Sequence, residues 1–267
     1  MATPPDLRLY SLHVSPWSER ARWVLDHHGL PFHKIEHIPF LGERRLRKVL
    51  GNPAGRVTVP VLIADGQTLA DSWEIALYAD RVGQGSQLIP AELAADVRRW
   101  HDLAERSMSA GRALTIASLL ATDAALEEML PPATPRLARR LLRPVVRRTT
   151  RWFVSKYNLD LAGTAQAQGV LRESLAALRS TLVRSEYVLG SFSYADIIAA
   201  SQLQGVVPVA DQYLRLGPAT RVAWTNPDLA AAFSDLVAWR DRLYQRHRRA
   251  GAPPPLQSSS SQSAGAV

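Results

Sequence analysis

The 267-residue sequence contains no cysteine, which excludes disulfide bonds, thiolate metal sites and a cysteine nucleophile. No stretch reaches the roughly 18 consecutive apolar residues that a membrane-spanning helix needs. The first residues, Met-Ala-Thr-Pro-Pro-Asp, lack the positive charge and the apolar run of a secretory signal. Apolar residues make up 46% of the chain, as in a globular protein. We therefore expect a cytoplasmic protein with no membrane association.

Lysine is also scarce, with 3 residues against 29 arginines, although the net charge is +8. The excess lies in residues 136–156, which contain eight Lys or Arg and no Asp or Glu. Most of these arginines recur at three- or four-residue spacing, which predicts a stripe along one helical face, with a possible break at Pro144. They are Arg136, Arg139, Arg140, Arg143, Arg147 and Arg151. A solvated face is the first interpretation, an anion-binding or partner surface the second, and nucleic-acid binding the third, since no nucleic-acid motif accompanies the stripe.

Hydrophobic periodicity divides the chain into two parts. Before about residue 85, strand patterns at 7–12, 32–38, 57–64 and 68–70 alternate with helical patterns at 16–28, 43–50 and from Asp71 onward. After Pro90 the pattern is helical, at 91–121, 136–156, 165–185, 194–207 and 227–249. The sequence therefore predicts an α+β protein with a β-α-β-α-β-β-α domain at 5–85 and an all-helical domain at 91–250. The Ser-, Pro- and Gly-rich residues 251–267 are predicted to be a disordered tail.

Ser15-Pro16 follows the first predicted strand and opens a helix, as a serine N-cap and a proline at the first helical position do. A cap with no further role is the simpler interpretation. The alternative is functional, because a hydroxyl at the positive end of a helix can stabilise a thiolate. Since the chain has no cysteine, the thiol would belong to a ligand.

Two further positions allow both a structural and a functional interpretation. Pro60 interrupts a strand pattern, so it marks either an ordinary strand edge or a cis bond that leaves the backbone of Val59 free for a ligand. Asp71 and Ser72 begin a helix, with Glu74 completing a capping pattern. The same helix start could bind a carboxylate through its N–H groups and the Ser72 hydroxyl, while Asp71 pairs with an ammonium group.

These motifs together resemble the glutathione S-transferase family. The resemblance rests on Leu9-Tyr10-Ser11, Ser15-Pro16-Trp17-Ser18-Glu19-Arg20, Asn52-Pro53, Thr58-Val59-Pro60-Val61-Leu62 and Asp71-Ser72-Trp73-Glu74. It continues in Gly190-Ser191-Phe192-Ser193-Tyr194-Ala195-Asp196 and Asn226-Pro227-Asp228-Leu229, and is poor between about 110 and 160. Serine stands in both cysteine positions of the Cys-Pro-x-Cys motif of thioredoxin-like proteins. The Asp-Ser-Trp motif resembles the bacterial β-etherase-like branch.

The resemblance implies a thioredoxin-like N-terminal domain, glutathione as co-substrate, no metal, a small hydrophobic electrophile and a homodimer. It implies that Ser15 activates the thiol, that Val59 before Pro60 pairs with the cysteinyl unit, and that Asp71 and Ser72 hold the γ-glutamyl end. Tyr10 is a rival activator. Thr58 stands where serine-type members often have lysine, and Asp71 where many have Glu or Gln; both departures concern glutathione affinity.

Two functions follow from this set of motifs. The preferred one is an enzyme that activates glutathione for attack on an electrophile. The alternative is a non-catalytic protein of the same fold that binds a ligand or another protein. His33 and His37 share a strand face but lie about 13 Å apart, too far to chelate one ion, so no metal site is predicted.

Overall fold

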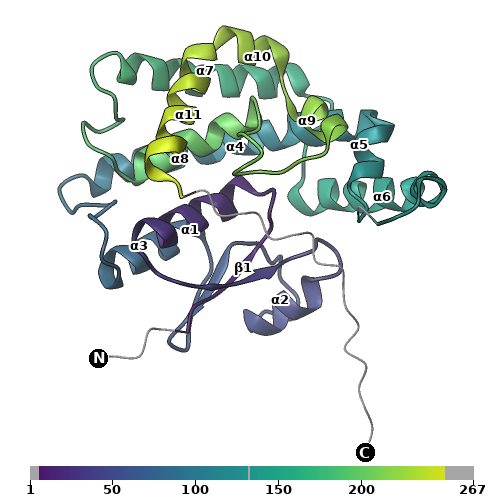
Figure 1. The fold of residues 1–267 in the computed structure, drawn as a ribbon, viewed down its shortest axis with the longest axis horizontal. Helices are drawn as coiled ribbons and strands as arrows, with labels where there is room; N and C mark the ends of the chain where they lie inside the picture. Colours follow the sequence, from purple (N-terminus) through teal and green to yellow (C-terminus); the bar gives the residue numbers. More distant parts are fainter. Residues whose placement is uncertain (1–5, 132, 250–267) are drawn as a thin grey trace, which may run out of the picture.

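A mixed sheet of β1 (Arg8–Ser11), β2 (His33–Glu36), β3 (Val61–Ala64) and β4 (Gln67–Leu69) occupies the first part of the chain in the computed structural model (Figure 1). The structure describes residues 6–131 and 133–249. The strand order is β2-β1-β3-β4; β2 runs parallel to β1, while β3 and β4 are antiparallel to their neighbours. The predicted order β-α-β-α-β-β-α is confirmed.

The sheet carries helices on both faces, because successive strand residues point in opposite directions. Leu9 belongs to the main core, which lies under α1 (Pro16–His27) and α3 (Ser72–Val82). The adjacent Tyr10 packs with Leu46 on the other face, under α2 (Glu43–Val49). Figure 1 shows α1 and α3 above the sheet and α2 below it.

The predicted strand at 57–64 is shorter than expected and begins only at Val61. The reason is Pro60, which has no backbone N–H to give to a strand partner and follows a cis peptide bond with Val59. The cis bond that we considered for this position is therefore present.

The second part of the chain is helical, as predicted. Its elements are α4 (Ala94–Ala121), α5 (Asp123–Glu128), α6 (Arg136–Tyr157), α7 (Thr164–Leu182), α8 (Tyr194–Gln202), a 3-10 turn (Leu203–Gly205), α9 (Pro218–Trp224), α10 (Pro227–Ala232) and α11 (Ser234–His247). The short helices α5 and α9 were missed, and the helix predicted at 227–249 is two helices that divide at Phe233. Residues 5 and 250 and the predicted tail 251–267 lie outside the described residues. Among the described helices, none has the length and apolar character needed to cross a membrane.

The two parts of the chain share one core. Trp23 of α1 is fully buried, and its ring centroid lies 4.4 Å from that of Tyr244 in α11. The Trp23 indole N–H donates to the carbonyl of His247 at 3.0 Å. The Tyr194 hydroxyl of α8 donates to the carbonyl of Ser72, at the start of α3, at 2.9 Å. Burial raises the pKa of Tyr194 to about 12, so this hydroxyl remains a donor at neutral pH.

The arginine stripe is not a single solvated face, so that interpretation is wrong for three of its members. Helix α6 continues through Pro144, and Arg143 and Arg147 both bind Asp123 of α5, at 2.6 and 2.7 Å. Arg139 donates to the carbonyl of Thr134 at 2.8 Å. These arginines therefore attach α6 to α5 and to the preceding loop.

Asn226 offers a test of the local capping interactions. Its side chain accepts the N–H of Leu229 at 3.1 Å at the start of α10. We expect Asn226→Ala to lower the free energy of unfolding by about 1 kcal/mol, because one N–H at the helix start loses its acceptor. Urea denaturation measures the change. Asn226→Ser keeps a capping oxygen and should recover most of the loss; equal losses in both variants would contradict the capping role.

Candidate functional site

Ser15, Val59 and Asp71-Ser72 lie at one edge of the sheet. Ser15 follows the end of β1, and Val59 precedes the start of β3; Tyr10 pairs with Val61 in the antiparallel register. The chain reaches Asp71 from β4, whose Leu69 pairs with Leu62 near the start of β3. The end of β1, the start of β3 and the end of β4 are therefore neighbours. The structure brings all the predicted site residues together at this edge.

Ser15 is the N-cap of α1. Its Oγ accepts the N–H of Ser18 at 3.3 Å, and Pro16 takes the first helical position. The side chain is half-buried. Its hydroxyl hydrogen is free to point outward from the helix start, where the partial positive charge of the helix favours an anion.

The second serine of the motif has a different role. Ser18 is fully buried, and its Oγ accepts the N–H of Leu12 at 3.1 Å. It thereby closes the turn between β1 and α1. Only the first serine position is accessible to a ligand.

Val59 presents backbone groups at the same edge. It is half-buried and lies just outside the paired part of β3. Within the described part of the chain, neither its N–H nor its C=O makes a hydrogen bond. Because buried backbone groups normally find partners, this short extended segment is suited to pair with the backbone of a peptide ligand.

Asp71 and Ser72 form the start of α3. Asp71 is exposed, and its Oδ1 accepts the N–H of Glu74 at 2.8 Å. The Glu74 carboxylate in turn accepts the N–H of Ala70 at 2.9 Å. Ser72 is 2% exposed and occupies the first helical position. The capping interpretation is therefore confirmed for Asp71, and its exposed carboxylate remains accessible to a ligand.

Tyr10, the rival of Ser15, is directed away from this edge. It is 7% exposed and packs in the cluster with Leu46, Val57 and Val61 under α2. The guanidinium of Arg45 lies 5.4 Å from its ring centroid. Tyr10 is thus a core residue on the face of the sheet that α2 covers.

Trp17, two residues after Ser15, belongs to a cluster that joins α1 to the helical part and that the sequence did not predict. The Trp17 indole N–H donates to both oxygens of Glu105 in α4, at 2.8 and 2.9 Å, and the fully buried Arg20 binds the same carboxylate at 2.7 Å. The Arg112 guanidinium lies 3.9 Å from the Trp17 ring centroid and 4.2 Å from that of Tyr157. Burial lowers the pKa of Arg112 and raises the pKa of Tyr157. The cluster therefore places aromatic rings and a guanidinium group close to the first turn of α1, to which Trp17 belongs.

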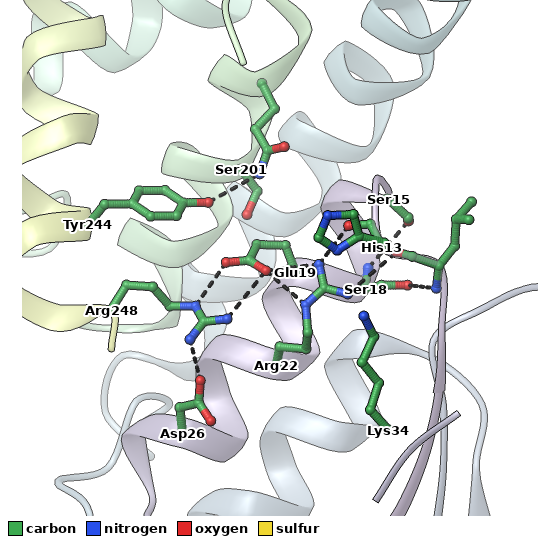
Figure 2. A network of polar contacts seen from close by, with 12 residues as sticks. His13, Ser15, Ser18, Glu19, Arg22, Asp26, Lys34, Ser201, Tyr244 and Arg248 are labelled. Carbon is green, nitrogen blue, oxygen red and sulfur yellow. Dashed lines mark hydrogen bonds and ion pairs between the residues drawn. The ribbon is translucent and has the colours of Figure 1, made fainter. Parts of the chain in front are cut away.

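A buried ion network fixes α1 beneath Ser15 (Figure 2). Glu19 accepts from Arg248 at 2.8 Å and from Arg22 at 2.9 Å, and Arg248 also contacts Asp26. Arg22 donates in addition to the carbonyl of His13 at 3.0 Å, in the turn that leads to Ser15. Burial alone would raise the pKa of Glu19, but Arg248 and Arg22 lower it below its ordinary value. The network ties the far end of the chain to the helix that presents Ser15.

One hollow on another part of the surface does not include the predicted residues. A hollow of about 420 Å³ opens on α2, bordered by Arg44, Arg47, Lys48, Gly51 and Pro53. Within the described residues, no group of three or more His, Asp or Glu side chains is arranged to hold a metal ion.

A small α/β domain joined to a helical part, with this edge site between two helix starts, defines the class as thioredoxin-like. The family comparison is more specific: residues 14–82 match the model of the glutathione S-transferase N-terminal domain. No curated protein sequence matches the chain.

Solved structures extend the likeness to both parts of the chain. A glutathione S-transferase from Methylobacillus flagellatus with glutathione bound is 21% identical, covers 91% of this chain and 96% of its own, and has a TM-score of 0.59. The β-etherase LigF from Sphingobium sp. strain SYK-6 has 21% identity, coverages of 90% and 95%, and a TM-score of 0.59. A Methylobacterium radiotolerans glutathione S-transferase in complex with glutathione sulfonate has 20% identity, coverages of 95% and 97%, and a TM-score of 0.59. The chain therefore has the glutathione S-transferase fold, with that family's N-terminal domain and a mostly helical remainder.

Proposed function

We propose that the protein is a serine-type glutathione transferase that binds glutathione at the sheet edge and activates its thiol. The observation that carries the proposal is the backbone of Val59, which makes no hydrogen bond to any described residue and lies next to a cis-proline, between the starts of α1 and α3. An extended tripeptide with an acidic end and a thiol fits such an edge. The solved structures of this fold with glutathione or glutathione sulfonate bound support the same ligand.

Each predicted residue has a role in the proposal. Val59 pairs its backbone with the cysteinyl unit and Pro60 holds that segment in place. Ser72 and the N–H groups of α3 bind the γ-glutamyl carboxylate, while Asp71 binds its ammonium group. Ser15 donates its hydroxyl hydrogen to the sulfur.

Ser15 and the start of α1 promote loss of the thiol proton to water. A free thiol has a pKa of about 8.5, and a hydrogen-bond donor together with the positive end of a helix lowers it. The thiolate then forms a C–S bond with an electrophilic carbon, whose leaving group departs with the bonding electron pair. The protein stabilises the negative charge on sulfur before that step.

The electrophile in this proposal is small and largely apolar. Trp17, two residues after Ser15, and Tyr157 offer aromatic surface, and the Arg112 guanidinium contacts both rings. The proposal also includes a bacterial, distantly β-etherase-like origin, which the likeness to LigF supports. It further includes a homodimer and a role in detoxification in the cytoplasm. Light scattering after size-exclusion chromatography measures the oligomeric state.

Calorimetry with glutathione and with cysteinylglycine tests the binding site. The wild type should bind glutathione. It should bind cysteinylglycine, which lacks the γ-glutamyl end, with much lower affinity than glutathione. Ser72→Ala should weaken glutathione binding but not further weaken cysteinylglycine, whereas Ser155→Ala, at an exposed position of α6, should change neither. Absence of glutathione binding by the wild type would refute the proposal. Binding without conjugation of a chlorodinitrobenzene would favour the non-catalytic alternative.

Tyr10 provides a matched test of the activator. Its hydroxyl makes no hydrogen bond within the described residues, and its ring is in the core under α2. We therefore expect Tyr10→Phe to keep the conjugation rate within about twofold, because the packing is retained and no polar partner is lost. Steady-state kinetics measure the rate. A large fall in kcat/KM with unchanged thermal unfolding would instead identify Tyr10 as the activator.

A further inference from the structure

Helix α6 has an outer face that the fold does not use. We define it by Arg136, Leu137, Arg140, Leu141, Val145 and Arg148. Leu137 and Leu141 are each 71% exposed and Val145 is 57% exposed. The three arginines are exposed as well, and they make no hydrogen bond, ion pair or ring contact with any residue that the structure describes.

The inner face of the same helix shows that this exposure is selective. Arg143 and Arg147 bind Asp123, and Val146 and Thr150 are buried. Asp123 of α5 is therefore occupied by inner-face arginines. The outer arginines have no counter-charge on the helix, because residues 136–156 contain no Asp or Glu.

A loop from the N-terminal part extends the exposed apolar surface. Phe40 lies with its ring centroid 5.6 Å from that of Trp152, near the end of α6. Phe40 is 53% and Leu41 is 73% exposed. Lys156 of α6 binds Glu43 at 2.6 Å, which fixes this loop and α2 against the helix. Apolar side chains thus follow α6 from Leu137 to Trp152, over about 22 Å at 1.5 Å per residue, and continue onto the loop.

We propose that the outer face of α6 binds the surface of a membrane that contains anionic lipids, with the helix lying along the surface. Leucine and valine side chains between arginines fit the boundary between headgroups and acyl chains, where apolar groups are buried and guanidinium groups pair with phosphates. Helix α6 lies at the periphery of the helical part, beside α5 (Figure 1). A bilayer surface can approach a helix in this position from outside.

Charge argues against a second copy of the chain at this face, and the apolar side chains argue against nucleic acid. A second copy docked through the same face would place three unpaired arginines against three others. Nucleic acid would satisfy the arginines but leave Leu137, Leu141 and Val145 without an apolar partner. An anionic bilayer satisfies both kinds of side chain, and it does not require a helix that spans the membrane. The proposal is independent of glutathione binding.

Sedimentation of the full chain with lipid vesicles tests the proposal. The protein should sediment with vesicles of phosphatidylcholine and phosphatidylserine, and not with vesicles of phosphatidylcholine alone. The combined variant Arg136→Gln, Arg140→Gln and Arg148→Gln should lower the partition coefficient about a hundredfold, at roughly fivefold for each arginine. The matched control Arg184→Gln, Arg215→Gln and Arg242→Gln removes the same charge at exposed positions outside α6 and should have a much smaller effect.

The apolar part has its own variant. Leu137→Ser, Leu141→Ser and Val145→Ser should weaken vesicle binding at least tenfold while leaving the thermal unfolding transition unchanged, because all three side chains are exposed. The proposal is overturned if the wild type does not bind phosphatidylserine vesicles, if the apolar variant binds equally well, or if the control triple loses as much affinity. It is also overturned if the wild type does not bind vesicles but binds polyglutamate through the same arginines. That result would indicate an acidic protein partner.

Discussion

Replacing Ser15 by alanine is expected to lower kcat/KM for glutathione conjugation by about 10²- to 10³-fold. The hydroxyl is the proposed hydrogen-bond donor to the sulfur, and loss of one donor to a developing anion costs this much in comparable sites. The pH profile should change as well. Activity rises with pH as the bound thiol ionises, and without the donor this rise should move toward the free-thiol pKa of about 8.5. Steady-state rates with a chlorodinitrobenzene across pH measure both effects.

The structural part of the change must be separated from the chemical part. Ser15 also caps α1 through the N–H of Ser18, so alanine should lower the free energy of unfolding by about 1 kcal/mol. Ser15→Thr keeps both the cap and the hydroxyl, and it should recover most of the rate. If Ser15→Ala and Ser15→Thr are equally slow, or if Ser15→Ala keeps the wild-type pH profile, Ser15 does not activate the thiol.

Local sequence signals predicted the two helix starts and the special position of Pro60, because each of these features depends on adjacent residues. Ser15 and Pro16 define a helix start because cap and first-turn preferences involve adjacent residues. Pro60 marks the beginning of β3 because it cannot donate to a ladder. Since β3 lies between β1 and β4 and is antiparallel to both, these local features meet at one edge of the sheet.

Contacts between distant segments could not be predicted in the same way. The cluster of Trp17, Glu105 and Arg112 joins α1 to α4 across more than 80 residues. The arginine spacing in α6 was recognised, but spacing does not say which face is covered; Asp123, in the unpredicted helix α5, determines it. Helix α5 has six residues, too few for a periodic pattern to be distinguished from a turn.

Glu19 illustrates the longest of these contacts, and its replacement should have the largest effect on stability. Glu19 is 4% exposed and bound by Arg22 and by Arg248, which lies 229 residues away. We expect Glu19→Gln to lower the free energy of unfolding by about 3 kcal/mol, because it leaves two buried guanidinium groups without their shared carboxylate. Urea denaturation at neutral pH measures the change.

The stability difference between wild type and Glu19→Gln should depend on pH in a defined direction. The pKa of Glu19 in the folded protein lies below its ordinary value of 4.5, so its stabilising effect is complete above that value and is lost as the pH falls through the lower, folded-state pKa. The stability difference between wild type and Glu19→Gln should therefore shrink on acidification below about pH 4.5. Glu186→Gln is the matched control, since Glu186 also binds an arginine, Arg246, at 2.7 Å, but is about half exposed. It should have a far smaller effect, and a comparable loss in both variants, or a difference that grows at low pH, would show that burial of the network does not stabilise α1.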